Sequence, residues 1–291
     1  MTGGVLLLVV AAAVAHATWN LTIKKAGTSG AGFLWLTFAV GAVVFAPFGI
    51  RSLIESGTDA GRWLLLAAVS GALQVGYFLL LQRAYRAADV SVVYPLARGT
   101  GPLLSVILAM VLLGERPGVL ALVGAAVVVA GVVTIGLAGS RSRLAWSTVS
   151  SPRAGILYGL AVGVLIAAYT LWDSSAVTVG GMPPTGLYWG SVVAQTVILA
   201  PAAFRARRAL PTIARTHWAA ILIVGILAPL AYILVLIAVQ LAPVSLIAPA
   251  REASVVLVSL AGWLLLREPH PAQRLAGAAI VLAGVALLAR S

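Results

Sequence analysis

Two arginines in the middle of long apolar segments, Arg98 and Arg251, are the residues best suited to do chemistry. A charge in such a segment costs at least ~2.5–3.5 kcal/mol on membrane-insertion scales, so it normally faces a cavity or a partner. A guanidinium donates hydrogen bonds in a planar fork that fits a carboxylate or a phosphate. The two arginines therefore predict an anion site. The alternative is a purely structural ion pair with Glu252.

Glu252 directly follows Arg251, and on a helix the two side chains would point about 100° apart, so we expect them to pair poorly. An ion pair between Arg98 and Glu252 is the better expectation, because aligning Pro95 with Pro249 brings these positions into register. Intramembrane acids also serve as proton relays. The candidates for binding a coupling proton are Glu252, Asp173 and His16.

Two segments repeat an aromatic and polar cluster. The sequence HATWN at 16–20 matches YTLWD at 169–173, and residues four apart lie on one helix face. These side chains could line a pocket with a stacking ring and hydrogen-bonding groups. The alternative is that Trp19 and Trp172 anchor their helices at a lipid–water interface.

Small residues accompany the first arginine. Tyr94, Arg98, Gly101 and Ser105 follow one another at steps of four, three and four residues, which places them on one helix face. We expect the small residues to leave room for a ligand beside Arg98.

The composition identifies the class of protein that holds these residues. Apolar residues make up 62% of the 291 positions and charged residues 9%, with a mean hydropathy of +1.08. Soluble domains have roughly 45–50% apolar and about 25% charged residues. An all-α integral membrane protein is therefore expected.

The polar residues exclude several functions. The net charge of +12 comes from Lys and Arg in short gaps between apolar runs, which is typical of loops at anionic headgroups rather than of nucleic-acid binding. The chain has no Cys and only three scattered His, so neither a metal site nor a cofactor is expected. No nucleophile–base pair suggests an enzyme.

Ten apolar stretches are long enough to cross a bilayer, and the gaps between them are mostly short. We expect consecutive spans to be antiparallel neighbours, with kinks or breaks near Pro95, Pro229 and Pro249. The predicted spans are 3–23, 31–50, 62–83, 90–113, 118–138, 154–178, 185–204, 216–240, 244–266 and 272–290.

The chain is duplicated. Trp19 and Trp172 are 153 positions apart (172 − 19), and the same offset relates Arg98 to Arg251 and Glu115 to Glu268. Residues 1–140 form the first repeat, 141–152 a central linker and 153–291 the second repeat. Each repeat holds five predicted spans, and an odd number inverts the second repeat in the membrane. Such inverted repeats are common in transporters.

Recurring residues that carry no charge, or that lie at turns, favour a structural role. Gly124 and Gly131, and their counterparts Gly277 and Gly284, predict a close packing face between helices, as does the pair at 159 and 163. Glu115 precedes a proline that opens the next span, where a carboxylate suits a helix N-terminus.

The motifs LLGERPGVLALVGAAVVVAGVV and LLREPHPAQRLAGAAIVLAGVA, with WNLTIKK after the first span, resemble the EamA family of the drug/metabolite transporter superfamily. Arg267 replaces the family's glycine before the second Glu. Relatives move amino acids, sugar phosphates, nucleotide sugars, cations or drugs. The resemblance implies a substrate pocket among spans 1, 3, 4, 6, 8 and 9, and both termini in the cytoplasm. The Lys and Arg residues instead gather at the end opposite the termini, which predicts termini outside. Orientation stays open.

We therefore expect a multi-pass protein of the plasma (inner) membrane that exports or exchanges a small organic metabolite by alternating access, with two halves rocking around a central pocket. A carboxylate or phosphate on the substrate would bind the arginines. Alternatives are a proton-coupled cation or drug exporter using Glu252 or Asp173, and a lipid-carrier flippase or non-transporting partner. The predicted substrate-binding residues are His16, Trp19, Asn20, Tyr77, Tyr94, Arg98, Tyr169, Trp172, Tyr232, Arg251 and Glu252.

Overall fold

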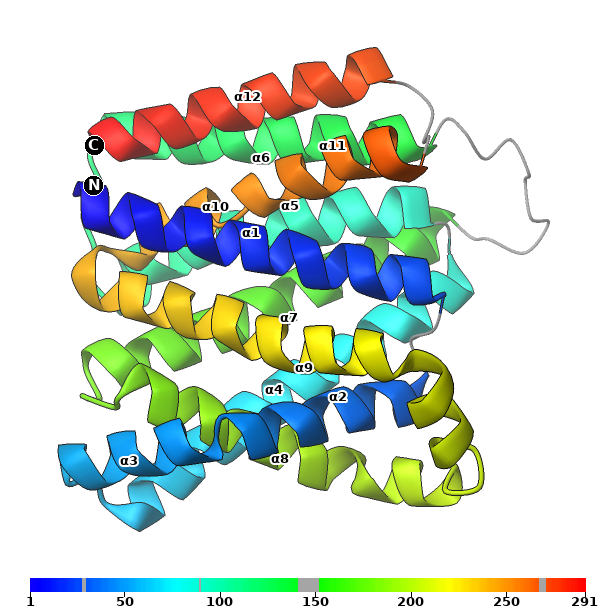
Figure 1. The fold of residues 1–291 in the computed structure, drawn as a ribbon. Coiled ribbons are helices and arrows are strands. Elements are labelled where there is room, and N and C mark those ends of the chain that lie inside the picture. Colours follow the sequence, from blue (N-terminus) through cyan, green and yellow to red (C-terminus); the bar gives the residue numbers. More distant parts are fainter. Residues whose placement is uncertain (28–29, 89, 141–151, 267–270) are drawn as a thin grey trace.

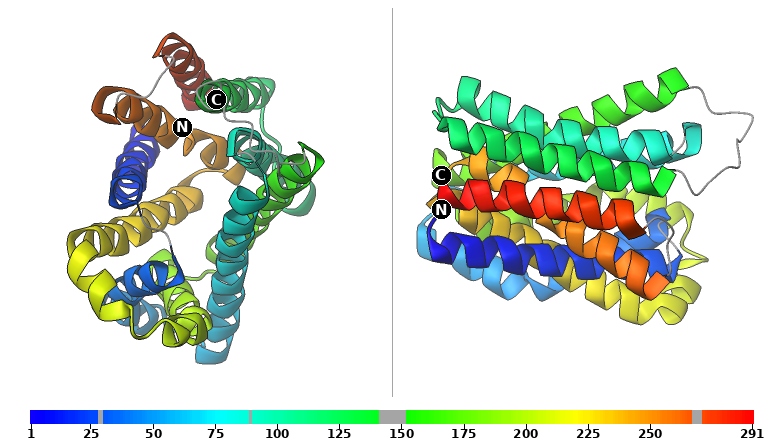
Figure 2. Two further views of the ribbon diagram at one scale, coloured as in Figure 1. Left: turned by 90° about the vertical axis from the view of Figure 1, so that its right-hand side faces the viewer. Right: turned by 90° about the horizontal axis from the view of Figure 1, so that it is seen from above.

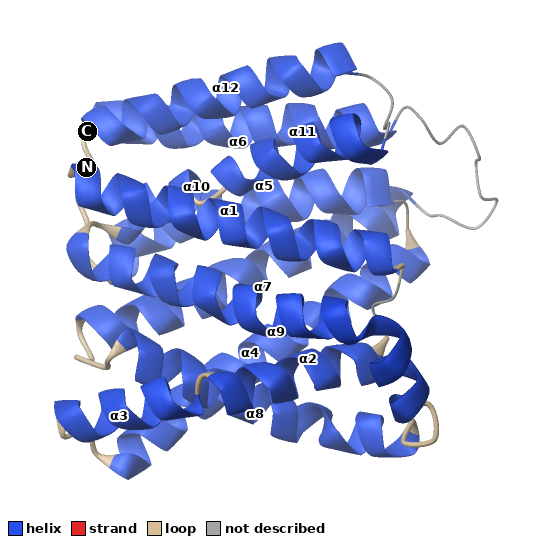
Figure 3. Ribbon diagram, viewed as in Figure 1, coloured by secondary structure: helices blue, strands red, loops and turns tan. Residues whose placement is uncertain are grey.

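A computed structural model describes residues 1–27, 30–88, 90–140, 152–266 and 271–291. Within these ranges every regular element is a helix, and no strand occurs (Figure 3). The helices are α1 (Gly3–Ala26), α2 (Ala31–Val44), α3 (Ala46–Ser56), α4 (Ala60–Ala87), α5 (Val90–Leu112), α6 (Val119–Ser140), α7 (Pro152–Thr178), α8 (Pro184–Arg205), α9 (Leu210–Leu241), α10 (Val244–Ala250), α11 (Ala253–Leu266) and α12 (Pro271–Arg290).

In the described ranges, nine helical segments are long and apolar enough to cross a membrane, and there are ten if the bent pair α2 and α3 counts as one span. The predicted span 31–50 is therefore not one straight helix. The two parts meet at an angle of 51°. Pro47 lies in the first turn of α3, where its missing N–H is tolerated but continuation of the preceding helix is not.

The predicted span 244–266 is also broken, and the break falls at the residues of greatest interest. α10 ends at Ala250 and α11 begins at Ala253, so Arg251 and Glu252 lie between them. The prediction of a break near Pro249 is confirmed. At the other two prolines the helices do not break, because α5 continues through Pro95 and α9 through Pro229. α9 is instead kinked at His217, whose backbone is non-helical.

Apolar side chains cover the outside of the bundle and polar side chains lie within it. Leu7, Val43 and Val111 are each more than 70% exposed, whereas Asp173 and Glu252 are at most 1% exposed. A protein in water would show the opposite arrangement. An apolar exterior of this extent fits surroundings of lipid.

The helices run back and forth along one direction, and both termini lie at the same end of the bundle (Figure 1). α1 and α7, which begin the two repeats, run in opposite directions (Figure 1). This is the inversion that an odd number of spans per repeat requires.

Consecutive spans are antiparallel, and some of them, such as α5 and α6, are neighbours as expected. The most extensive packing, however, joins helices of different repeats: α6 with α12, α5 with α7, α1 with α9, and α4 with α8. Viewed end on, the helices surround a central region (Figure 2). The two repeats are therefore interleaved, because each inverted copy supplies the partner surface for the other.

The predicted glycine faces are confirmed. A Cβ on Gly131 would lie 2.9 Å from the carbonyl oxygen of Gly277, and one on Gly284 would lie 2.8 Å from that of Gly124. α6 and α12 thus approach each other at backbone distance. Gly159 faces α5 in the same way, where a Cβ would meet the Cβ of Leu96 at 2.7 Å.

Glu115 has a different partner from the one expected. Its two carboxylate oxygens accept hydrogen bonds from the backbone N–H groups of Val244 and Ser245, at 2.8 and 2.9 Å. The residue therefore caps α10 of the other repeat rather than α6, which follows it in the chain. Its counterpart Glu268 lies outside the described residues.

Candidate functional site

A cavity lies among helices of both repeats and is lined by Arg98, Arg251 and Glu252. Its volume is about 120 Å³, roughly ten times what one water molecule needs on the same scale, so it can hold a small solute. Its wall extends from Ala12, halfway along α1, to Ile23 near the end of that helix. The lining residues are Ala12, Ala13, His16, Trp19, Ile23, Leu34, Thr37, Phe38, Gln74, Tyr77, Phe78, Arg98, Tyr169, Tyr188, Val224, Ala228, Ala231, Tyr232, Val235, Arg251, Glu252 and Ser254.

The structure brings together most of the predicted substrate-binding residues. His16, Trp19, Tyr77, Arg98, Tyr169, Tyr232, Arg251 and Glu252 all line this cavity. Asn20, Tyr94 and Trp172 lie outside the lining. Asn20 donates a hydrogen bond from Nδ2 to the carbonyl oxygen of His16, one turn earlier in α1, at 2.8 Å.

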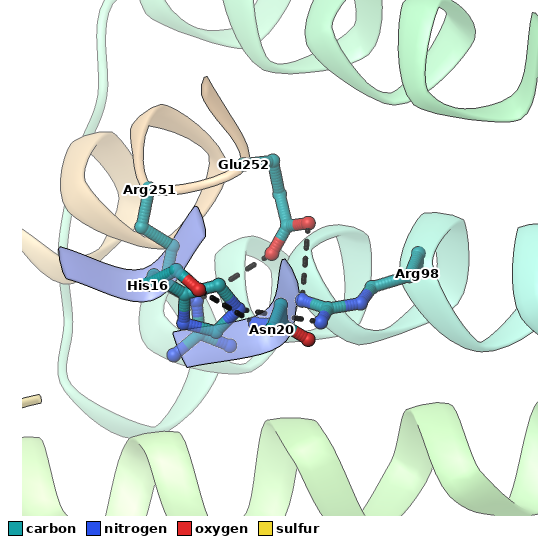
Figure 4. A network of polar contacts seen from close by, with 5 residues as sticks. All are labelled: His16, Asn20, Arg98, Arg251 and Glu252. Atoms are coloured by element: carbon teal, nitrogen blue, oxygen red, sulfur yellow. Dashed lines mark hydrogen bonds and ion pairs between the residues drawn. The ribbon is translucent and has the colours of Figure 1, made fainter. Parts of the chain in front are cut away.

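Both arginines contact one carboxylate (Figure 4). Arg98 Nη1 donates to Glu252 Oε2 at 3.4 Å, and Arg251 Nε lies 3.6 Å from Glu252 Oε1. Arg98 Nη2 also lies 3.5 Å from Nε2 of His16. The predicted ion pair between Arg98 and Glu252 is therefore confirmed. With two guanidinium groups against one carboxylate, this group of side chains has a net positive charge if all three are ionised.

The expectation that Arg251 and Glu252 would not pair is wrong. The helix ends at this point, and the turn is closed by bonds from Glu252 N to the oxygen of Pro249 and from Ser254 N to that of Arg251. Because the backbone is not a continuous α-helix here, the ~100° separation does not hold. The long arginine side chain reaches back to the carboxylate at ion-pair distance.

The small residues near Arg98 were expected to leave room for a ligand, but Gly101 does not do so. A Cβ on Gly101 would lie 2.7 Å from a methyl group of Ile166, so this glycine allows α5 to pack closely on α7. Tyr94 lies under the arginine, with the guanidinium carbon 5.8 Å from the ring centre. This contact between the Tyr94 ring and the guanidinium helps to hold the Arg98 side chain in place.

The recurring tryptophans have different surroundings. Trp172 donates a hydrogen bond from Nε1 to the carbonyl oxygen of Leu66 at 3.0 Å and thus joins α7 to α4. Trp19 lines the cavity, and its buried Nε1 has no hydrogen-bond partner among the residues that the structure describes. A buried donor without a partner is costly unless a ligand or water completes the bond.

A second group of polar side chains is buried beside the cavity and centres on Asp173. Its Oδ2 accepts hydrogen bonds from the hydroxyl of Tyr232 at 2.9 Å and from Nε2 of Gln74 at 3.2 Å. The Oε1 of Gln74 accepts from Tyr188 at 3.3 Å and from Gln195 at 3.2 Å. This network joins α4, α7, α8 and α9.

Sequence reasoning missed Gln74, Phe78 and Tyr188 as cavity residues. Gln74 is a polar residue in the middle of the third predicted span, three positions before Tyr77, and that spacing places both on one helix face. This signal was available. Tyr188 lies near the start of its span, where a tyrosine is ordinary at an interface, and nothing marked it.

The cavity has the groups for binding a solute but not those of a metal centre. In the described ranges, no three His, Asp or Glu side chains lie together in a way that could hold a metal ion.

The fold and the cavity define a class: a multi-pass helical membrane protein built from two related repeats around a central polar cavity. The chain belongs to the EamA-like transporter family, whose sequence pattern matches residues 3–137 and again 153–290. It is therefore a membrane transporter of the drug/metabolite type. No curated protein sequence matches the chain.

A solved structure, described as the crystal structure of a protein, supports the fold. It is 19% identical in sequence, and the alignment covers 99% of this chain and 96% of that one with a TM-score of 0.75. At this identity the likeness extends to the fold alone.

Proposed function

We propose that the protein is a secondary-active transporter of the plasma membrane that exports or exchanges a small organic anion by alternating access. The carboxylate or phosphate of the substrate binds Arg98 and Arg251. The observation that carries this proposal is the sharing of one carboxylate, Glu252, by both arginines inside the cavity. The two arginines carry two positive charges and Glu252 carries one negative charge. A bound anion supplies a second negative charge, so that the charges of the site then balance.

The remainder of the cavity wall suits an organic body. Trp19 offers an unpaired Nε1 donor, and the rings of Tyr77 and Tyr169 meet edge to face with centres 5.9 Å apart. Most other lining side chains are apolar. This combination of a few placed polar groups with apolar walls is usual for small-molecule sites.

The alternative of a cation or drug exporter has weaker support. It requires a free carboxylate in the cavity, yet both oxygens of Glu252 contact arginine nitrogens. Asp173 is the remaining acid near the cavity, but it is not part of the lining. A cation would therefore meet the arginines before it met an available negative charge.

The test is transport by purified protein in liposomes. Thermal stabilisation by succinate, glutamate and glycerol 3-phosphate identifies an anion that binds, and uptake of that radiolabelled anion is then measured. We expect Arg98→Ala and Arg251→Ala each to reduce uptake at least tenfold, since each loses a charge-assisted contact of about 1.5–3 kcal/mol. Arg86→Ala, at an exposed position near the end of α4, is the matched control and keeps parental uptake.

Three outcomes would contradict the proposal. Anion uptake by both arginine variants at the parental rate would remove the anion site. Stabilisation by organic cations but not by anions would favour a cation exporter. Binding without uptake of any solute would favour a flippase or a non-transporting membrane partner.

A further inference from the structure

Asp173 of α7 is buried beside the cavity, and no ion pair joins it to a cation among the described residues. Its side chain has no exposed surface, and its Oδ1 has no hydrogen-bond partner in that part of the chain. The ion pairs in the described part of the chain involve other acids, namely Glu55 and Glu252. An ionised carboxylate in such surroundings has an effective cost of several kcal/mol, which a bound proton removes.

We propose that Asp173 is a proton-binding site of the transport cycle and that it takes up its proton together with the anionic substrate. The proton and the anion then cross the membrane together, so export of the anion carries a proton out with it. This inference rests on the anion site at Arg251 proposed above, and it adds the coupled ion and the sign of the coupling.

Tyr232 and Gln74 connect Asp173 to the cavity. Both residues line the cavity, and both donate a hydrogen bond to Asp173 Oδ2. A proton reaches the carboxylate when Tyr232 passes its hydroxyl proton to Oδ2 and takes another from a hydronium ion that enters the cavity, which leaves water. The net change is the transfer of one proton from the solvent to Asp173, and the reverse transfer releases it.

Electrostatics set the sign of the coupling. The guanidinium of Arg251 lies 5.9 Å from the ring centre of Tyr169, which is one helical turn before Asp173 on α7. A positive charge at this place attracts a negative charge on Asp173. An anion bound to Arg251 cancels the charge and favours proton binding by Asp173. By linkage, a proton on Asp173 strengthens anion binding equally.

Among the described residues, none of the groups that face Asp173 is a carboxyl or an imidazole group. The groups that face Asp173 are Ser70 and Gln74 of α4, Tyr169 of α7, Tyr188 of α8, Tyr232 of α9 and Arg251 at the helix break. Tyrosine and arginine side chains keep the same net protonation state near neutral pH, even where a tyrosine relays a proton. His16 and Glu252 lie at Arg98 instead, and Glu252 is held by two cations.

Infrared difference spectroscopy of the purified protein tests the proton site without any ligand. We expect a protonated-carboxyl band in the parent that is absent in Asp173→Asn and retained in Asp59→Asn, a matched change at the N-cap of α4. Arg251→Gln should keep the band to a higher pH than the parent, because it removes the positive charge. Arg251→Lys should titrate like the parent. Absence of a band assignable to Asp173, or no effect of Arg251→Gln, would overturn the inference.

Sulfate tests the coupling, because this anion does not titrate near neutral pH. We expect sulfate to bind with uptake of about one proton by the parent, measured with an indicator dye in weakly buffered solution. Asp173→Asn should bind sulfate without proton uptake and with an affinity independent of pH. Sulfate binding by the parent without proton uptake would refute the coupling. A parent that binds no sulfate would count against the arginine site, whereas the infrared result judges Asp173 separately.

Discussion

At the scale of single residues, the duplicated tryptophan has a different role in each repeat. Trp19 and Trp172 occupy equivalent positions of the repeats, and the sequence treats them alike. In the structure Trp172 Nε1 joins two helices through the carbonyl of Leu66, whereas Trp19 Nε1 lies unpaired in the cavity wall. The polar atom therefore stabilises the fold in the second repeat, whereas in the first it is buried and unpaired in a residue that lines the cavity.

Replacing each tryptophan by phenylalanine should separate these tasks. Trp172→Phe loses a hydrogen bond and should lower the free energy of unfolding by about 1 kcal/mol. Trp19→Phe loses no bond within the protein, so its free energy of unfolding should stay within about 0.5 kcal/mol of the parent or rise. Its anion affinity should fall several-fold. Denaturation in detergent and anion-induced thermal shifts measure the two effects.

The two variants control for each other, because both remove the same atoms from equivalent positions. A destabilised Trp19→Phe protein with parental anion affinity would show that this indole is structural.

Sequence reasoning found the charged residues of the cavity and missed neutral ones. The pairing of Arg98 with Glu252 was predictable because charges in apolar segments are few and must be compensated. Gln74 was not singled out, since a lone amide in a span can equally bond a neighbouring helix. The Trp19 and Trp172 environments could not be told apart, because the helix packed against each differs and sequence periodicity does not reveal it.

At the scale of elements, the short helix α10 needs support from outside. It has only seven residues and stands before the break that presents Arg251 and Glu252 to the cavity. A helix of this length is not stable alone. Glu115 satisfies the backbone N–H groups of Val244 and Ser245, so a turn in one repeat holds a helix of the other.

Glu115→Ala should therefore weaken the site at a distance. It leaves two backbone donors without their charged acceptor, and the free energy of unfolding should fall by about 1.5–3 kcal/mol. Anion affinity should fall as well, because the helix break loses its anchor. Glu55→Ala is the control: Glu55 pairs with Arg51 on an exposed helix face, and its loss should change stability by less than about 0.5 kcal/mol. Equal stabilities of the two variants would show that the cap on α10 is unimportant.

Element boundaries followed from hydropathy except where the chain bends. Hydropathy reports how apolar a stretch of sequence is on average. A break of two residues at Arg251 and Glu252 hardly changes the mean hydropathy of the whole span. The bend between α2 and α3 has a local signal in Pro47, but α5 carries two prolines without breaking. Packing against neighbouring helices decides which proline bends its helix, and packing is not visible in one sequence.

At the scale of the whole molecule, interleaving limits how the protein can move. The close backbone approach of α6 and α12 at Gly131 and Gly277 joins helices of different repeats. A repeat therefore cannot swing as a block without separating such pairs. We expect the moving units of the transport cycle to be groups of helices drawn from both repeats, and the cavity to change the end to which it opens.

Single cysteines test this change of access, since the chain has no native Cys. Ile23 and Ala12 both line the cavity, Ile23 near the end of α1 that carries Lys24 and Lys25, and Ala12 halfway along. We expect Ile23→Cys to react with a membrane-impermeant thiol reagent only from that end, and more slowly with a transported anion present. Ala12→Cys should react with the reagent from either side of the membrane, because a central site in alternating access faces each side in turn. A transported anion should change the ratio of the two reaction rates. Leu7→Cys, on the lipid-facing surface at 71% exposure, should not react. Reaction of Ala12→Cys from one end only, whatever anion is added, would mean that the cavity never changes sides and would exclude this mechanism.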